Sequence, residues 1–130
     1  MKKDASEILK MVSDAITRTY DPKGDKIFSF AFIGQMNGKI LHESIAILTG
    51  KSGEHNNTHV LYVVSPQALD DYYNPLAALQ LIPMGKAGTM IEFYYPERTN
   101  SAHAVRIINI IKNELTNMNE NWSHQLNWIN

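Results

Sequence analysis

The stretch "KIFSFAFIGQMNGKILHESIAILT", residues 26–49, decides the expected fold. Two segments rich in apolar residues flank Asn37 and Gly38. An Asn-Gly pair is typical of a tight hairpin, because both central positions of the turn take positive φ. With these two residues at the turn, the antiparallel register pairs Phe28 with Ile47. The sequence therefore predicts a hairpin with one bulky side and one side of smaller residues.

The sequence before the hairpin predicts an amphipathic helix, because apolar residues recur there at steps of three and four. These residues are Ala5, Ile8, Leu9, Val12, Ile16 and Tyr20, and "DPKGD" at 21–25 follows as a stop signal. Beyond the hairpin, "HVLYVVS" at 59–65 and "TMIEFYY" at 89–95 are rich in β-branched and aromatic residues. Such segments predict a third and a fourth strand.

The segment between these two strands predicts a broken helical connection. Ser65 and Pro66 supply an N-cap and a first-turn proline for a short helix. Asn74 and Pro75 repeat that pattern in front of "LAALQLI". Because a proline interrupts a helix, we expect two helical pieces here instead of one rod.

A long helix is expected from about Ser101 to the last turn of the chain. Ile107 and Ile110 lie off its main apolar line, so the helix is apolar on more than one side and is expected to lie between two surfaces. The main line steps by four and three in alternation. Its members are Ala104, Ile108, Ile111, Leu115, Met118 and Trp122, and the step continues through Gln125 to Ile129.

These elements, in the order α-β-β-β-α-β-α, predict an α+β fold. Its mostly antiparallel four-stranded sheet is packed with an N-terminal helix, a broken middle helix and a long C-terminal helix. A chain of 130 residues with 44% apolar composition fits a single domain over residues 1–130.

Composition excludes several classes of function. Lys and Arg number 12 against 13 Asp and Glu, and the chain has no cysteine. A near-neutral charge gives no broad field for nucleic acid or an anionic membrane, and the lack of cysteine rules out disulfides and thiolate chemistry. Charges within the first segment argue against a signal peptide, and no stretch reaches the roughly 18 apolar residues of a membrane span. We expect a cytoplasmic protein with neither cofactor nor metal.

The stretch "ILTGKSGEHNNTH", residues 47–59, looks at first like a phosphate-binding loop. A Walker loop needs a glycine five residues before its Gly-Lys-Ser triplet and a helix directly after it. Ile45 stands at the glycine position, and a polar turn followed by a strand comes next. The Walker interpretation is therefore rejected, and a flexible loop that binds an anion weakly through Lys51 remains open.

Histidines and one glutamate near the hairpin are weak candidates for chemistry. His55 and His59 are spaced like a helical metal pair, but along a strand such residues lie about 13 Å apart. A zinc site would also need a third ligand from His42 or Glu43. In the predicted hairpin Glu43 lies opposite Phe32 on the bulky side, so it either ends the buried part of the strand in water or has a partner.

The chain end, "MNENWSHQLNWIN", contains large apolar side chains where small domains usually fray. These are Trp122, Leu126, Trp128 and Ile129. Such groups pack either on their own domain or on another chain, and tryptophan often concentrates binding energy at interfaces. They are our candidates for partner binding.

Two functional hypotheses follow. The first is a non-catalytic binding protein, expected to be a homodimer, that acts by occupying a protein partner; inhibitors, immunity proteins, phage accessory proteins and chaperones are built at this scale. The second is a small-ligand or nucleotide-binding protein or weak enzyme that uses the loop over residues 50–59 and nearby tyrosines. Its candidate ligand-binding residues are Lys51, Ser52, His55, His59, Tyr62 and Tyr94.

Overall fold

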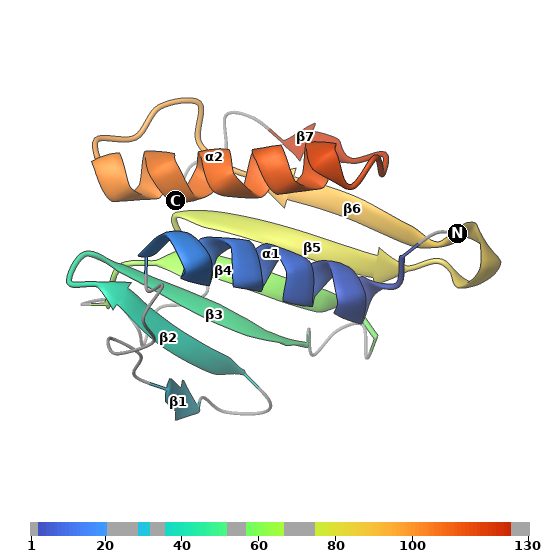
Figure 1. The fold of residues 1–130 in the computed structure, drawn as a ribbon, viewed down its shortest axis with the longest axis horizontal. Helices are drawn as coiled ribbons and strands as arrows, with labels where there is room; N and C mark the ends of the chain where they lie inside the picture. The colour runs from blue at the N-terminus through green and yellow to red at the C-terminus, as the bar shows by residue number, and fades with distance from the viewer. Residues whose placement is uncertain (1–2, 21–28, 32–35, 52–56, 67–74, 126–130) are drawn as a thin grey trace.

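A computed structural model describes residues 3–20, 29–31, 36–51, 57–66 and 75–125 of the chain (Figure 1). The predicted α+β class and the mostly antiparallel sheet are confirmed, but the number of strands and helices differs. The described helices are α1 (Ala5–Tyr20) and α2 (Ala102–Asn117). The strands are β1 (Ser29–Ala31), β2 (Asn37–His42), β3 (Ile45–Lys51), β4 (His59–Val64), β5 (Ala77–Pro83), β6 (Thr89–Tyr94) and β7 (Ser123–Gln125).

The sheet follows the order of the chain, β1-β2-β3-β4-β5-β6-β7. Strands β1 to β6 pair with one another as consecutive antiparallel neighbours. Strand β7 pairs with β6 in parallel. Parallel neighbours need a crossover connection, and here α2 supplies it. The last three elements thus form a β-α-β unit at one edge of an antiparallel sheet.

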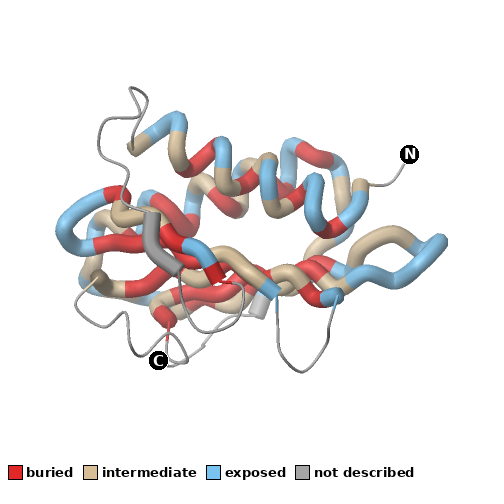
Figure 2. The backbone as a smooth tube through the Cα atoms, turned by 90° about the horizontal axis from the view of Figure 1, so that it is seen from below, coloured by how far each residue is buried: buried red, intermediate tan, exposed pale blue. Residues whose placement is uncertain are grey.

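Both helices cover the same face of the sheet and run in opposite directions side by side (Figure 1). Figure 2 shows the helix layer on one side of the sheet, with buried positions where the two layers meet. The buried residues of α1 are Ala5, Ile8, Val12, Ala15 and Ile16, which confirms the predicted helix and its apolar face. They pack with Leu61, Leu79 and Phe93 of the sheet in one large core.

A second, smaller cluster lies on the opposite face of the sheet. It consists of Met36, Ala46, Leu48, Val60 and Val64, with Ile40 and Tyr62 packed against it. Because side chains alternate between faces along a strand, β3 and β4 contribute to both clusters. The middle of the sheet is therefore buried on both sides, which explains the nearly continuous apolar sequence of these strands.

The predicted turn at Asn37-Gly38 is wrong. Both residues lie inside β2, where Gly38 pairs with Phe30 on one side and Leu48 on the other. The segment predicted as the second strand of the hairpin is instead divided into β2 and β3 by a turn at Glu43 and Ser44, which are both exposed. The exposure of Glu43 agrees with the alternative in which the buried part of the strand ends there. Pairing of β2 with both β1 and β3 overrides the local preference of the Asn-Gly pair.

The predicted helix over "PLAALQLI" is also wrong, because this segment forms β5. Leu79 and Leu81 face the helices and are fully buried, while Gln80 faces the opposite side. The burial period is two residues, so pairing with β4 and β6 overrides the helical preference of alanine and leucine. The short helix expected after Ser65 falls on residues 67–74, outside the described residues.

The long helix begins where expected but ends earlier. Ser101 is the N-cap, and its Oγ accepts a hydrogen bond from the Ala104 backbone N–H at 3.1 Å. The helix ends at Asn117, and the chain turns into β7 instead of continuing in helical form to Ile129. The predicted apolar line from Ala104 to Met118 is buried. Ile107 is also fully buried in the domain's own core, which accounts for the second apolar side of the helix.

Candidate functional site

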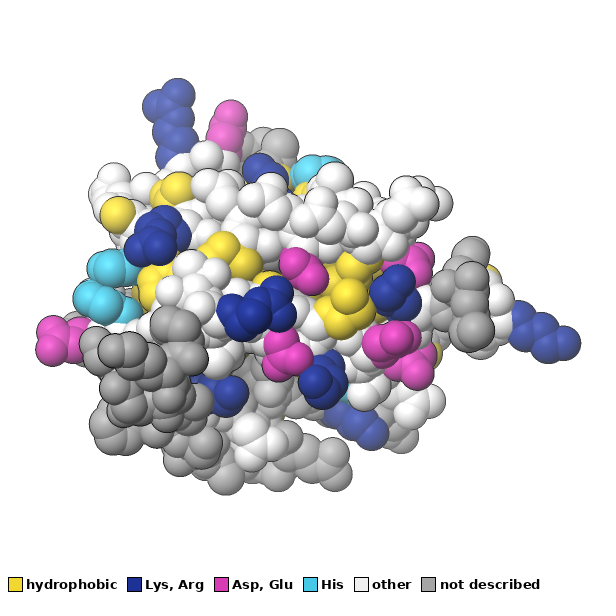
Figure 3. Space-filling model, viewed as in Figure 1, with side chains coloured by type: hydrophobic (Ala, Val, Ile, Leu, Met, Phe, Trp, Pro, Cys, Tyr) yellow, Lys and Arg dark blue, Asp and Glu magenta, His cyan; other side chains and the backbone are white. Residues whose placement is uncertain are grey.

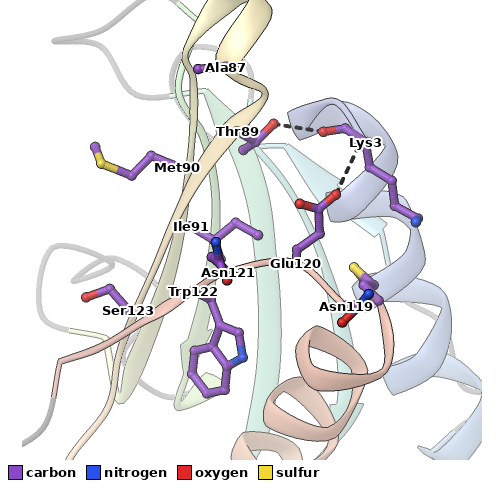
Figure 4. Close-up of a pocket in the computed structure, with 11 residues that line it drawn as sticks. Lys3, Ala87, Thr89, Met90, Ile91, Asn119, Glu120, Asn121, Trp122 and Ser123 are labelled. Atoms are coloured by element: carbon purple, nitrogen blue, oxygen red, sulfur yellow. Dashed lines mark hydrogen bonds between the residues drawn. The ribbon is translucent and has the colours of Figure 1, made fainter. Parts of the chain in front are cut away.

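The antiparallel helix pair has two junctions with the rest of the domain, and pockets lie near both, including one of about 420 Å³ beside the start of α2. We call the end of α1 and the start of α2 the closed junction, and the start of α1 and the end of α2 the open junction. The open junction has a pocket of about 680 Å³. Its lining residues are Lys3, Ala87, Thr89, Met90, Ile91, Met118, Asn119, Glu120, Asn121, Trp122 and Ser123 (Figure 4).

The pocket exists because α2 stops short of the sheet edge. Met118 caps the helix with its backbone N–H bonded to the Glu114 carbonyl, and Asn119 follows with φ of 60°. Asparagine is among the few residues that adopt this left-handed conformation readily at a helix end. The turn redirects the chain toward β6, so Glu120 and Asn121 cross the gap between helix and sheet.

Glu120 and Lys3 close one side of the pocket. The Lys3 backbone N–H donates to Glu120 Oε1 at 3.1 Å, across 117 positions of sequence. The Lys3 carbonyl in turn accepts a hydrogen bond from the Thr89 hydroxyl at 3.1 Å. Figure 4 shows both bonds converging on the Lys3 backbone, while the lysine side chain runs away from the carboxylate. Two backbone bonds thus fix the segment before α1 against both β6 and the end of α2.

Trp122 forms another wall and anchors β7 to the core. Its ring centroid lies 6.4 Å from Phe93 and 3.7 Å from His124. The Tyr95 hydroxyl and His124 Nδ1 form a hydrogen bond of 2.9 Å. Trp122 is half-buried, so it contributes to the core and to the pocket at the same time. Of the predicted partner-binding residues, Leu126, Trp128 and Ile129 lie outside the described residues.

Burial shifts the acidity of two tyrosines that contact α2. Desolvation raises the pKa of Tyr95, beside which Lys112 Nζ lies 5.2 Å from the ring centroid. Desolvation also raises the pKa of Tyr20 at the closed junction, and the positive charge of Arg106 partly opposes this rise. The Arg106 guanidinium carbon lies 4.8 Å from the Tyr20 ring centroid. Both phenols therefore stay neutral to a higher pH than an ordinary tyrosine does.

The closed junction is filled by aromatic rings. His42, at the end of β2, stacks on His103 of α2 with ring centroids 3.8 Å apart. Tyr20 meets His103 edge-on and donates a hydrogen bond of 3.4 Å to the His103 carbonyl. His103 Nδ1 is buried and has no hydrogen-bond partner within the described part of the chain. These contacts join α1, β2 and α2 at this junction.

The predicted ligand-binding residues do not form one site. Lys51 pairs with His59 at the ends of β3 and β4, and both belong to the row that faces the helices. Tyr62 and Tyr94 occupy a row on the opposite face, with Ala78 between them. Ser52 and His55 lie outside the described residues. Gly50 and Lys51 continue the strand ladder, which agrees with rejection of the Walker interpretation.

Tyr94 has the largest shift in acidity among the described tyrosines. Its hydroxyl donates a short hydrogen bond to Glu92 Oε2 on the same strand. This bond, with desolvation and the negative charge of Glu92, raises the pKa of Tyr94 to about 12. The raised pKa keeps this phenol protonated at neutral pH, so the Tyr94 hydroxyl remains the hydrogen-bond donor to Glu92.

Two further features limit the chemistry available to the described residues. No three histidine, aspartate or glutamate side chains lie together in a group able to hold a metal ion there. Neither α1 nor α2 is long and apolar enough to cross a membrane. On the face that carries the helices, basic and acidic side chains alternate without a large patch of either sign (Figure 3).

Sequence reasoning found Trp122 but missed most of the pocket, including Lys3, Thr89 and Glu120. The signal lay in "NMNENW", where Asn119 directly follows the last buried residue of α2. An asparagine at that place indicates a helix end. The helical spacing of apolar residues, in alternating steps of four and three, continued to Trp122. This spacing hid the helix end from sequence analysis. The sequence matches no known family model, and no curated protein or solved structure shows significant similarity to it.

Proposed function

We propose that this protein is a non-catalytic binding protein that occupies a partner protein through the pocket at the open junction. The observation that carries the proposal is the mixture of groups around this pocket. Met90, Met118 and Trp122 supply apolar surface, and Asn119 and Asn121 supply exposed amides. Methionine and tryptophan are enriched at protein interfaces, and side-chain amides can pair with the peptide groups of an incoming chain.

The shape of the pocket favours a polypeptide segment over a compact ligand. The lining comes from the segment before α1, the β5–β6 hairpin and the connection from α2 to β7. The hairpin also exposes Met84, which is 49% exposed, next to the pocket-lining Met90, which is 41% exposed. Flexible methionine side chains adapt to varied partners. A short extended segment would contact this apolar rim and the amides together.

Inhibition, immunity, phage accessory and chaperone roles all remain within this proposal. A homodimer and a cytoplasmic location stay predictions. The outer side of α2 is polar at Arg106, Asn109 and Asn113, and among the described α2 residues only Val105 is a large apolar side chain that is exposed. The molar mass in solution, measured by light scattering, tests the dimer independently of the pocket.

The test is a selection of random linear peptides displayed on phage against the wild-type protein. Asn121→Arg places a bulky side chain at an exposed position of the pocket, and Asn113→Arg makes the same change on the exposed side of α2. We expect enriched peptides to bind the wild type and Asn113→Arg but not Asn121→Arg. Binders that tolerate Asn121→Arg, or a selection that enriches none, would contradict the proposal.

A further inference from the structure

We infer that the pocket at the open junction selects a basic side chain, a lysine or an arginine, from the partner segment. This inference rests on the proposed function and specifies the chemistry that the pocket recognises. Three observations support it: a positioned carboxylate, a helix end without a basic residue and apolar side chains in the lining.

The carboxylate is Glu120, the only acidic residue of the pocket lining. The Lys3 backbone N–H binds its Oε1, and Oε2 accepts no hydrogen bond from the described residues. A carboxylate held by one bond loses less side-chain entropy when it binds a ligand. Its second oxygen is therefore a prepared acceptor for an ammonium or guanidinium group.

The second observation concerns the end of α2. The carbonyl groups of the last turn carry partial negative charge, which a basic residue commonly compensates. The last turn of α2 contains no basic residue. The negative end of the helix and the Glu120 carboxylate thus lie on the same side of the pocket, and their fields favour a cation there.

The third observation is the apolar surface beside the carboxylate. Trp122 is half-buried and provides accessible apolar surface in the lining, where Met118 and Ile91 lie buried beside it. Lysine and arginine combine a charged head with an apolar stem that packs along such surface. The His124 ring lies against the Trp122 ring with centroids 3.7 Å apart, and we assign Trp122 to contact with the stem of the basic side chain.

Lys3 is the competing cation in the pocket. Its backbone holds Glu120, but its ammonium forms no ion pair with that carboxylate among the described contacts. A bound basic side chain would be repelled by this ammonium. Removing each charge should therefore have opposite effects: Glu120→Gln weakens binding of a cation and Lys3→Gln strengthens it. An anionic ligand would show the reverse pattern.

The experiment titrates the intact protein with N-acetyl-lysine methylamide, and with N-acetyl-norleucine methylamide as the uncharged match. The chain has 2 tryptophans, so the indole N–H region of a nitrogen-15 spectrum is simple, and Trp122→Phe assigns the signal. We expect a saturable shift of the Trp122 signal with the lysine probe only. Glu120→Gln should weaken the apparent affinity about fivefold, as for a part-exposed ion pair, while the exposed Glu97→Gln, with the same change in charge, should not.

Equal responses to the two probes, or a stronger response in Glu120→Gln, would overturn the inference. The phage selection distinguishes failure of this inference from failure of the proposed binding function. Peptides that depend on Asn121 but lack a conserved basic residue would leave the binding role intact and refute the selection of a cation. Peptides that tolerate Asn121→Arg would refute the binding role itself.

Discussion

The two junctions of the antiparallel helix pair are built in different ways. At the closed junction, His42 stacks on His103 and Tyr20 meets His103 edge-on, so ring contacts join the elements. At the open junction, backbone bonds of Lys3 to Glu120 and Thr89 hold the elements together, and a pocket remains between them. Packing rings consumes volume, whereas backbone hydrogen bonds fix position without filling space. The difference shows how hydrogen bonds can fix the position of elements at one end of a small domain while a pocket remains between them.

The largest expected effect tests whether the open junction depends on the core beneath it. Phe93 is fully buried and supports Trp122. Phe93→Ala should lower the free energy of unfolding by about 3–5 kcal/mol, the usual cost of a large-to-small change in a core. Denaturant unfolding measures the change. Met90→Ala, on the same strand but 41% exposed, is the control and should change stability by less than about 0.5 kcal/mol.

The next effect concerns the closed junction, where Ser101 caps α2. Ser101→Ala removes the acceptor of the Ala104 N–H and should lower the free energy of unfolding by about 1 kcal/mol. Ser101→Asp keeps an acceptor oxygen and should restore most of the loss. An equal loss in both variants would show that stacking at His103, and not the cap, fixes the start of the helix.

A comparable effect is expected at the opposite end of α2. Asn119 has φ of 60°, which costs most residues about 1–2 kcal/mol. Asn119→Ala should lower the free energy of unfolding by about 1 kcal/mol, and Asn119→Gly should leave it unchanged or raise it slightly, since glycine adopts this conformation freely. If alanine were tolerated as well as glycine, the turn that opens the pocket would not depend on the left-handed residue.

The smallest effect is electrostatic and distinguishes Tyr20 at the closed junction from Tyr95, which follows β6. Desolvation raises the pKa of Tyr20 and Arg106 opposes the rise, so Arg106→Gln should raise the Tyr20 pKa further and leave that of Tyr95 unchanged. Because the folded pKa exceeds the ordinary value, the stabilising contribution is complete below about pH 10 and is lost as pH rises through the folded pKa. Nuclear magnetic resonance titration of the ring signals follows each tyrosine, and a Tyr95 shift equal to that of Tyr20 would refute the assignment to Arg106.

Local patterns predicted much of the fold. The first helix, the strands at His59 and Thr89, and the Ser101 start of α2 follow from periodicity and capping. The errors came where tertiary contacts decide between local options. Asn37 and Gly38 became part of β2 because β1 and β3 pair with them on both sides, and "LAALQLI" became β5 because both of its edges are paired. The pocket could not be predicted, since Lys3, Thr89 and Glu120 meet only after the helices are placed.

The bond from Lys3 to Glu120 also has a consequence for the order in which the protein assembles. Neighbouring strands of the meander are consecutive in the chain, so each hairpin can form as soon as it has been synthesised. The meeting of Lys3 and Glu120 requires nearly the whole polypeptide. Such distant contacts carry the largest loop-closure entropy and tend to form late. During synthesis on the ribosome, α1 would be made long before α2 is available to pack against it. The pocket at the open junction would therefore be the last of these features to form.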